Sequence, residues 1–300
     1  LLSFPFGLFR IVKYILSLRP DVVICSLWRA SIIGVIVKAL RSRTRFISFI
    51  HSTKFFHSLD AAFSKLAINS ADEILTDSKA TSNALTPHLR TSAPVRGVSY
   101  FTVPSPSSKR NALLYPQKEI SFLYLGRINK VKNIPLSIDV ISYLRSCHIN
   151  ASLELDGKDD GLLTELNEYI ELQNMTDYVH YKGELNPSSK SDIFSNYNFL
   201  IQLSEAEGMA MSVAEAMQYG VVPVVTPVGE IPNYSKDMES AVFVDIWDST
   251  GWLQSLAKVK MVTSNIDIYN SMSDCCFTSM QGVKTYTESL VHYISNDSHL

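Results

Sequence analysis

The chain has 300 residues, enough for two domains of ordinary size or for one large domain. Hydrophobic residues make up 46% and charged residues 19% of it, which is typical of globular proteins and not of long disordered segments. The formal net charge of −2 argues against a chain built to neutralise a phosphate backbone, so nucleic acid is not an expected partner. The four cysteines show neither C-x-x-C spacing nor a Cys/His cluster, which argues against a zinc site or disulfide framework and favours the reducing cytoplasm.

The first twenty residues are apolar but do not have the form of a signal peptide. Charges recur at Arg10, Lys13 and Arg19, and no small-residue cleavage site follows them. The best candidate for a membrane span, residues 21–40, is interrupted by two basic residues. Residues 4–18 place Phe, Leu and Ile beside basic side chains, which fits either a packing helix or a helix lying in a lipid interface. We therefore expect a cytoplasmic protein, with peripheral contact to the inner face of the cell membrane as a further possibility.

Short apolar runs alternate with helical patterns along most of the chain. Most of these runs are continuous rather than alternating, as expected for strands of a parallel sheet covered on both faces. This strand–helix–strand alternation predicts an α/β fold with right-handed crossovers. Strands are predicted at residues 21–25, 45–50, 73–76, 120–125, 152–155, 178–181, 199–203, 221–225 and 241–244. Helices are predicted at residues 135–146, 162–172, 211–219 and about 279–294, among others.

A segment rich in proline and serine, residues 102–118, interrupts this alternation and is typical of a linker between domains. Only three clear strands precede it, too few for a complete Rossmann-like half, whereas six follow it in good order. We therefore predict an incomplete first domain over residues 1–105, a linker over 106–118 and a second domain over 119–278. Residues 279–300 are expected to form a terminal helix that docks on either domain.

The first group of candidate site residues follows the predicted strand at 120–125. Gly126 ends this strand, and a glycine there lets a ligand approach the backbone at a strand-to-helix turn, where open α/β sheets bind ligands. Arg127 and Lys132 place two cations nearby, which suits a diphosphate. Asn133 is the expected cap of the next helix. A solvated basic turn is the alternative interpretation of these residues.

The second group follows the seventh predicted strand. A loop with Glu207 and Gly208 leads into a helix whose N-terminus offers unpaired N–H groups to an anion or a hydroxyl-rich ligand. Glu207 and Glu215 are eight residues apart, and two carboxylates so placed can each accept hydrogen bonds from a pair of sugar hydroxyls. Two alternatives stay open: Glu215 closes its own helix in a capping box with Ser212, and Glu207 is an exposed loop acid. Residues 221–230 add a buried strand and a glycine turn at the same sheet edge.

Together these motifs resemble the C-terminal half of the retaining glycosyltransferase family 4, which has the GT-B architecture of two Rossmann-like domains with parallel sheets. The resemblance begins with GRINKVKN at 126–133 and continues with YVHYKGEL at 178–185. It ends with SEAEGMAMSVAEAMQYGVVPVVT at 204–226. The resembling run extends from Gly126 to Asp245, about 120 residues, and contains these elements in the family's order, which makes the ensemble far more specific than any one of them. One departure is DGKD at 156–159, where the family has Gly-x-Gly-Pro; it concerns the shape of that loop and not the fold.

The resemblance implies a role for each matching residue. Arg127 and Lys132 hold the diphosphate of the donor and stabilise it as it leaves. Glu207, the first acid of the family's E-x₇-E pair, orients the transferred sugar, and Glu215, the second acid, binds the ribose of the nucleotide. The other implied donor contacts are the turn at Gly126, the backbone amides of Gly208, Met209 and Ala210, and the base-binding loop at Gly183 and Glu184.

The part of the chain before the linker resembles the family more loosely. RPDVVI at 19–24, FISFIH at 46–51 and ADEILTDS at 71–78 each match a strand of its first domain. The second of these strands ends in His51, which the resemblance places toward the donor sugar or the acceptor; a structural histidine is the alternative. The family's first strand and glycine-rich loop have no counterpart in the sequence, which favours a fragment of a longer chain over a degenerate protein.

The implied function is transfer of a hexosyl unit from a UDP- or GDP-linked sugar to a hydroxyl of a glycan or lipid-linked acceptor, with retention at the anomeric carbon. Bacterial surface polysaccharide synthesis, including that of lipopolysaccharide, is the implied setting. No Asp-x-Asp metal motif stands in a suitable loop, so we expect no metal and no cofactor besides the donor substrate. Two alternatives stay open: a GT-B-fold sugar-nucleotide epimerase, and a non-catalytic protein that only binds sugar nucleotides.

Overall fold

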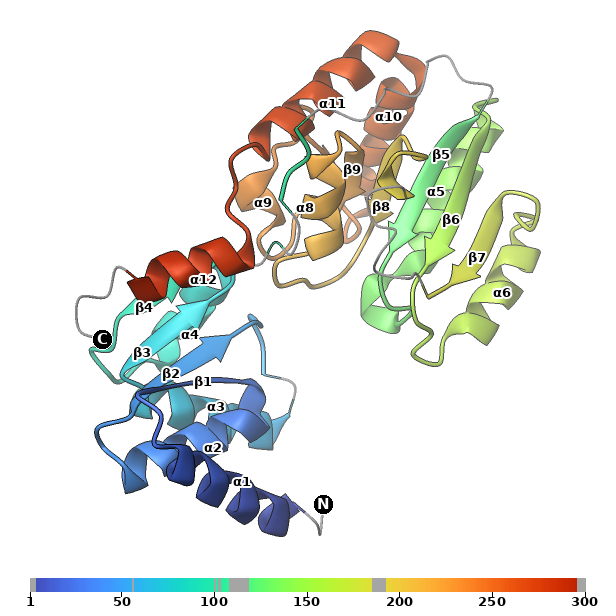
Figure 1. Ribbon diagram of the computed structural model, residues 1–300. Coiled ribbons are helices and arrows are strands. Elements are labelled where there is room, and N and C mark those ends of the chain that lie inside the picture. Colours follow the sequence, from blue (N-terminus) through green and yellow to red (C-terminus); the bar gives the residue numbers. More distant parts are fainter. Residues whose placement is uncertain are drawn as a thin grey trace. The chain divides into compact units, whose positions relative to one another are not determined.

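The computed structural model describes residues 4–55, 57–99, 101, 104–107, 119–184 and 193–295. Most of the predicted linker, residues 108–118, therefore lies outside the described residues. The chain divides into two compact units, the first comprising Leu1–Thr102 with Lys284–Leu300 and the second Val103–Val283. Each unit is built on one parallel sheet with helices against it (Figure 1). The expected α/β class with two parallel sheets is confirmed.

The first unit has a four-stranded sheet in the order β1-β2-β3-β4. Its strands are β1 (Val22–Ser26), β2 (Arg45–Ile50), β3 (Glu73–Thr76) and β4 (Val95–Gly97). Its helices include α1 (Phe4–Leu18), α2 (Leu27–Leu40), α3 (Ser58–Ser70) and α4 (Lys79–Leu85). The sequence predicts β2 and β3 with their observed bounds and β1 to within one residue. It does not predict β4, because this short strand contains a single bulky apolar side chain, that of Val95.

The C-terminal helix α12 (Tyr286–Ser295) belongs to the first unit, so the chain returns to that unit after it has completed the second. The helix begins later than the predicted residue 279, since the preceding turn contains Gly282 at a φ of 73°. One face of the helix packs on a buried cluster of the first sheet. The contacts join Tyr286, Leu290 and Tyr293 to Ile47, Phe49, Leu75 and Val98.

A buried carboxylate reinforces this docking. Glu73 at the start of β3 is almost fully buried and forms ion pairs with Arg45 and Arg96. The Arg45 guanidinium also donates to the Tyr293 hydroxyl over 3.1 Å, and the Arg96 guanidinium lies over the ring of Tyr293. Because a buried carboxylate that loses its cations is strongly destabilising, Glu73 couples the last helix to the stability of the first sheet.

The second unit has a six-stranded parallel sheet in the order β10-β9-β8-β5-β6-β7. Its strands are β5 (Ile120–Leu125), β6 (Ala151–Asp156), β7 (Val179–Gly183), β8 (Phe199–Gln202), β9 (Val222–Val225) and β10 (Val242–Phe243). Its helices include α5 (Ile134–Ser146), α6 (Leu163–Leu172), α8 (Met211–Gln218), α9 (Ile231–Tyr234), α10 (Ser249–Ser264) and α11 (Ile266–Ser279). Every residue of β8 and β9 is buried, as the continuous apolar runs predict.

The strand order of the second sheet reverses direction between β5 and β8. From β5 the chain adds β6 and β7 on one side, and then crosses back to add β8, β9 and β10 on the other. Phe122 and Phe199 stack across the β5–β8 pair with ring centroids 4.8 Å apart. Open α/β sheets bind ligands at such a topological switch point, where the loops leaving two neighbouring strands run in opposite directions. None of the helices in the described part of the chain combines the length and the apolar character that a membrane span requires.

Replacing Arg45 by Met is expected to lower the free energy of unfolding of the protein by about 2–3 kcal/mol, because Glu73 keeps only Arg96 and Tyr293 loses its donor. Urea unfolding followed by circular dichroism measures this change. Arg90→Met is the matched control at an exposed arginine and should cost less than about 0.5 kcal/mol. Equal effects of the two substitutions would contradict the structural role of Glu73.

Candidate functional site

The loops that leave β5, β6 and β7 lie in contact at the carboxyl edge of the second sheet. The amide of Gly126 donates to the carbonyl of Asp156 over 2.9 Å, and the amide of Gly157 donates to the carbonyl of Gly183 over 2.8 Å. A Cβ on Gly157 would lie 1.8 Å from the carbonyl oxygen of Gly126, and the φ of Gly157 is 150°. Only glycine fits this position, so the DGKD segment has its glycine at the point where the two loops meet.

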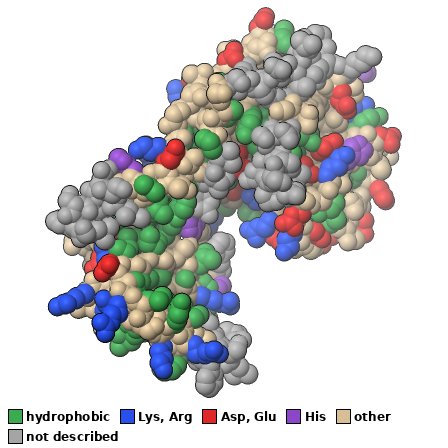
Figure 2. Space-filling model, in the orientation of Figure 1, with side chains coloured by type: hydrophobic (Ala, Val, Ile, Leu, Met, Phe, Trp, Pro, Cys, Tyr) green, Lys and Arg blue, Asp and Glu red, His purple; other side chains and the backbone are tan. Residues whose placement is uncertain are grey.

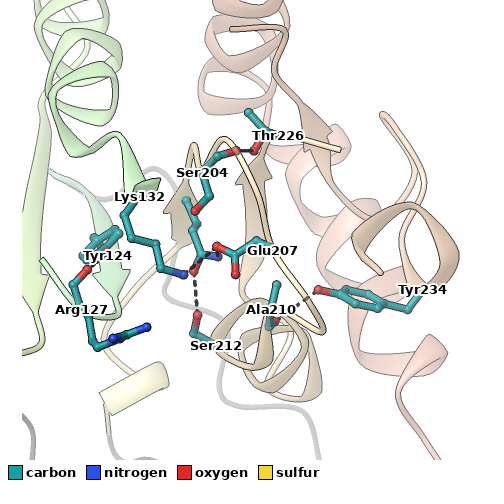
Figure 3. Close-up of polar contacts among 10 residues, drawn as sticks. Tyr124, Arg127, Lys132, Ser204, Glu207, Ala210, Ser212, Thr226 and Tyr234 are labelled. Atoms are coloured by element: carbon teal, nitrogen blue, oxygen red, sulfur yellow. Dashed lines mark hydrogen bonds and ion pairs between the residues drawn. The ribbon is translucent and has the colours of Figure 1, made fainter. Parts of the chain in front are cut away.

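An ion pair joins the two motifs that the sequence singles out. Lys132 lies in a 3-10 turn after β5 (η2, Lys130–Lys132), and Glu207 lies in the loop after β8. The Nζ atom of Lys132 is 2.6 Å from Oε1 of Glu207, and the two side chains are only 17% and 9% exposed (Figure 3). The same two loops are joined through the backbone, where the amide of Glu205 donates to the carbonyl of Val131 over 2.9 Å. The structure therefore places the predicted diphosphate-binding lysine against the predicted sugar-binding acid at the switch point.

Gln202, the last residue of β8, completes this arrangement. Its Nε2 donates to Oε1 of Glu207 over 2.7 Å, and its Oε1 accepts a hydrogen bond of 2.8 Å from the hydroxyl of Ser212. Glu207 is thus oriented from two sides, by a cation and by a buried amide. The sequence analysis missed Gln202, although a polar residue that ends the apolar run Phe199–Gln202 is a signal of a side chain aimed at the sheet edge.

Helix α8 does not begin with the capping box that the sequence left open. The N-cap residue is Ala210, in the left-handed conformation with φ 53° and ψ 61°, and it makes no side-chain capping bond. Ser212 lies inside the helix and donates to Gln202 instead. The capping-box interpretation of Ser212 and Glu215 is therefore wrong. Glu215 lies on the second turn of the helix and is buried.

The loop after β9 holds the segment before helix α8 in place. Gly229 has a φ of 62°, and a Cβ on it would lie 2.5 Å from the carbonyl oxygen of Gly208. The amide of Glu230 donates to this same oxygen over 2.9 Å. The Tyr234 hydroxyl donates to the carbonyl of Ala210 over 3.3 Å. The backbone of residues 208–210, including Met209, is thus held by contacts with the loop after β9. The sequence analysis placed this glycine turn at the same sheet edge.

Arg127 lies apart from the Lys132–Glu207 pair. Its side chain is 69% exposed and contacts Oδ2 of Asp160 at 3.2 Å. Its carbonyl accepts a hydrogen bond of 2.7 Å from the buried hydroxyl of Tyr124. Burial, with the negative charge of Glu207 second, raises the pKa of Tyr124, so this hydroxyl remains a donor. The backbone at Arg127 is therefore fixed while its guanidinium is held only by an exposed ion pair.

The edge at β6 and β7 contains a buried acid. Gly183 ends β7 with a φ of 89° and Glu184 follows it, whereas Leu185 lies outside the described residues. Asp156, at the end of β6, is buried, and burial together with the charge of Glu154 raises its pKa to about 6. Among the described residues, no group of His, Cys, Asp and Glu side chains is placed to hold a metal ion.

His51 stands at the carboxyl edge of the first sheet, after β2. Its Nδ1 lies 3.5 Å from Oδ2 of Asp77, which follows β3 and is buried. The hydroxyl of Thr81 donates to the other oxygen of Asp77 over 3.0 Å, and the ring of Phe49 packs against the imidazole. His51 is thus a partly exposed imidazole with a carboxylate behind one nitrogen. The sequence analysis did not single out Asp77, whose signal is an acid at the end of a buried strand.

Replacing Asp156 by Asn tests the raised pKa. In the wild type the folded state resists ionisation of Asp156, so its contribution to stability is fully present below pH 4 and is lost as the pH rises through about 6. The change in the free energy of unfolding caused by Asp156→Asn should therefore be more favourable at pH 7.5 than at pH 4, by about 1–2 kcal/mol. Urea unfolding at the two pH values measures this, with the exposed Asp177→Asn as control. A gain that is the same at both pH values would contradict the assignment.

Two family models match the chain. Residues 107–260 match Glycosyl transferases group 1, and residues 1–114 match Glycosyltransferase Family 4. The comparison with curated protein sequences gives no match.

Solved structures share the fold at low sequence identity. Sucrose-phosphate synthase from Thermosynechococcus elongatus superposes with a TM-score of 0.81 at 15% identity, over 98% of this chain and 77% of that one. HepE from Anabaena in complex with UDP gives 0.80 at 13% identity, over 98% and 82%. TarM from S. aureus gives 0.75 at 14% identity over 95% of this chain, which spans 57% of the length of TarM. With both family models matched and this fold observed, the chain belongs to the group 1 and family 4 glycosyltransferases of GT-B architecture.

Proposed function

We propose that the protein transfers a hexosyl unit from a UDP- or GDP-linked sugar to a hydroxyl of an acceptor, with retention at the anomeric carbon. The observation that carries this proposal is the Lys132–Glu207 pair at the switch point between β5 and β8. It unites a phosphate-binding cation and a sugar-binding carboxylate within 2.6 Å. The fold relative HepE was solved with UDP and with UDP-glucose, which supports a nucleotide sugar as the donor class.

When the donor binds, the two residues of the ion pair take on separate functions. A diphosphate brings more negative charge than a single carboxylate, so Lys132 turns to the phosphate oxygens, and the exposed Arg127 joins it. Glu207, still held by Gln202, then accepts hydrogen bonds from sugar hydroxyls beside the backbone of residues 208–210. Two cations on the diphosphate stabilise the charge that develops as it leaves.

The other residues that we assign to the donor lie along the same edge of the second sheet. Glu215 binds the ribose, and the loop at Gly183 and Glu184 binds the base of the nucleotide. Gly126 lets the donor approach the backbone. The leaving phosphate oxygen takes the proton of the acceptor hydroxyl on the same face, so the transfer requires neither a metal ion nor a strong protein base. In the first unit, Asp77 orients His51, to which we assign contact with the donor sugar or the acceptor.

The charge of the first unit favours an acceptor held at an anionic surface. This unit has 14 Lys and Arg against 7 Asp and Glu, a net +7, whereas the second has 13 against 22, a net −9. Figure 2 shows Lys and Arg side chains together with hydrophobic ones on the visible face of the first unit. Helix α1 exposes 68% of Phe9 and 64% of Tyr14 beside Arg10 and Lys13. We propose peripheral contact with the inner membrane face and a glycan or lipid-linked acceptor in surface polysaccharide synthesis.

Calorimetry with UDP, GDP and ADP tests the donor site directly. One nucleotide should bind saturably, and Lys132→Ala should weaken its binding at least tenfold, because the main cation of the diphosphate is lost. Lys236→Ala, at an exposed lysine of the same unit, is the control and should leave the affinity unchanged. Binding that is indifferent to Lys132, or absent in folded protein, would refute the site.

Glu207→Gln tests the proposed role of this carboxylate in sugar transfer. The amide keeps the size of the side chain but replaces one acceptor oxygen with a donor, so kcat for transfer or donor hydrolysis should fall about 100-fold. The same assay on wild-type protein identifies the product. Conversion of the donor into a new sugar nucleotide without an acceptor would contradict glycosyl transfer.

A further inference from the structure

A groove of about 340 Å³ lies beside the edge strand β10 of the second unit, apart from the residues assigned to the donor. Its walls come from the loop after β9, from the segment that follows β10 and from helix α10. The lining includes Pro227, Phe243, Asp245, Trp247, Gln254 and Lys258. We propose that this groove binds a neutral saccharide, the part of the acceptor glycan beyond its reacting sugar. This proposal rests on the proposed glycosyl transfer.

Trp247 supplies an aromatic surface for a sugar ring. The chain has three tryptophans, and only this one has most of its side-chain surface exposed, at 61%. Its backbone is fixed, because its amide donates to Oδ1 of Asp245 over 2.9 Å and the next residue, Asp248, caps helix α10 through the amide of Gly251. An indole on a fixed turn offers an apolar face and one N–H donor at a low cost in conformational entropy. This suits a pyranose, which has an apolar face and a polar rim.

The lysine of the groove is already paired with a carboxylate, and its aspartate is hydrogen-bonded. Nζ of Lys258 is 2.6 Å from Oδ2 of Asp237, and the carboxylate of Asp245 accepts the amide of Trp247. Gln254 precedes Lys258 by one helical turn on α10 and brings both a donor and an acceptor to the same wall. A phosphate would have to displace Asp237 from the lysine, whereas hydroxyl groups can be bound without disturbing the ion pair. The chemistry therefore favours a neutral saccharide over an anion.

The groove and the donor motif share one loop. Pro227 lines the groove, while Gly229, two residues later, lies against the carbonyl oxygens of Glu207 and Gly208. Thr226, which precedes Pro227 in the chain, donates from its hydroxyl to the carbonyl of Ser204 over 2.5 Å. A saccharide in contact with Pro227 is thus only one turn of the chain away from residues 208–210, which we propose lie beside the donor sugar. This position fits a neighbouring unit of a glycan rather than an unrelated ligand.

Saturation-transfer NMR on the full chain tests the groove with defined probes. The probes are the methyl glycosides of glucose, galactose, mannose and N-acetylglucosamine, with inorganic phosphate for comparison. At least one glycoside should bind saturably in the millimolar range and shift the indole N–H resonance of Trp247, and phosphate should not. Trp247→Ala should weaken this binding at least tenfold and Gln254→Ala about threefold. Leu253→Ala, at an exposed apolar residue of the same helix, is the matched control and should have no effect.

The affinity of each variant for the nucleotide that the wild type binds shows that the variant is folded and reports on the donor site separately. The saccharide site is refuted if no glycoside binds, if Trp247→Ala binds as well as wild type, or if phosphate competes for the groove. Self-association that disappears in Trp247→Ala, without any glycoside binding, would instead assign the groove to a second copy of the chain. In each of these cases retained nucleotide binding would leave the proposed donor site standing.

Discussion

The ion pair between Lys132 and Glu207 is the interaction on which the site depends. Both side chains are largely buried, and each supplies the opposite charge that makes burial of the other tolerable. The pair joins the turn after β5 to the loop after β8, the two strands between which the sheet reverses its order. It therefore fixes the two loops against each other at the place where an open α/β sheet binds its ligand.

Glycines and residues with a left-handed backbone conformation allow the loops around the ion pair to adopt their positions. Gly157 and Gly229 stand where any side chain would collide with the carbonyls of Gly126 and Gly208. Asn133 and Ala210, which cap helices α5 and α8, both adopt left-handed conformations and make no side-chain capping bonds. Such conformations are costly for residues other than glycine and persist where the surrounding contacts hold them. Here they bring the N-termini of both helices close to the Lys132–Glu207 pair.

The sequence predicts what depends on apolar pattern and on motif spacing. Most strands are found within one or two residues, because burial on both faces requires continuous apolar runs such as Phe199–Gln202. Which polar side chains pair is not encoded in that pattern. The sequence analysis therefore missed Gln202 and Asp77, and it left open a capping box at Ser212 that the structure excludes. The sequence equally left open the domain on which helix α12 docks, because its partners Arg45, Ile47 and Phe49 lie more than 200 residues earlier in the chain.

A double-mutant cycle on nucleotide affinity tests most directly whether Lys132 is shared between Glu207 and the donor diphosphate. The calorimetric dissociation constant of the preferred nucleotide would be measured for wild type, Lys132→Ala, Glu207→Gln and the double variant. If Glu207 competes with the diphosphate for Lys132, Glu207→Gln tightens binding in the wild-type background and has no effect when Lys132 is absent, a coupling of about 1 kcal/mol or more. Additive effects of the two substitutions would contradict the account, since they would show that the pair and the donor do not share the lysine.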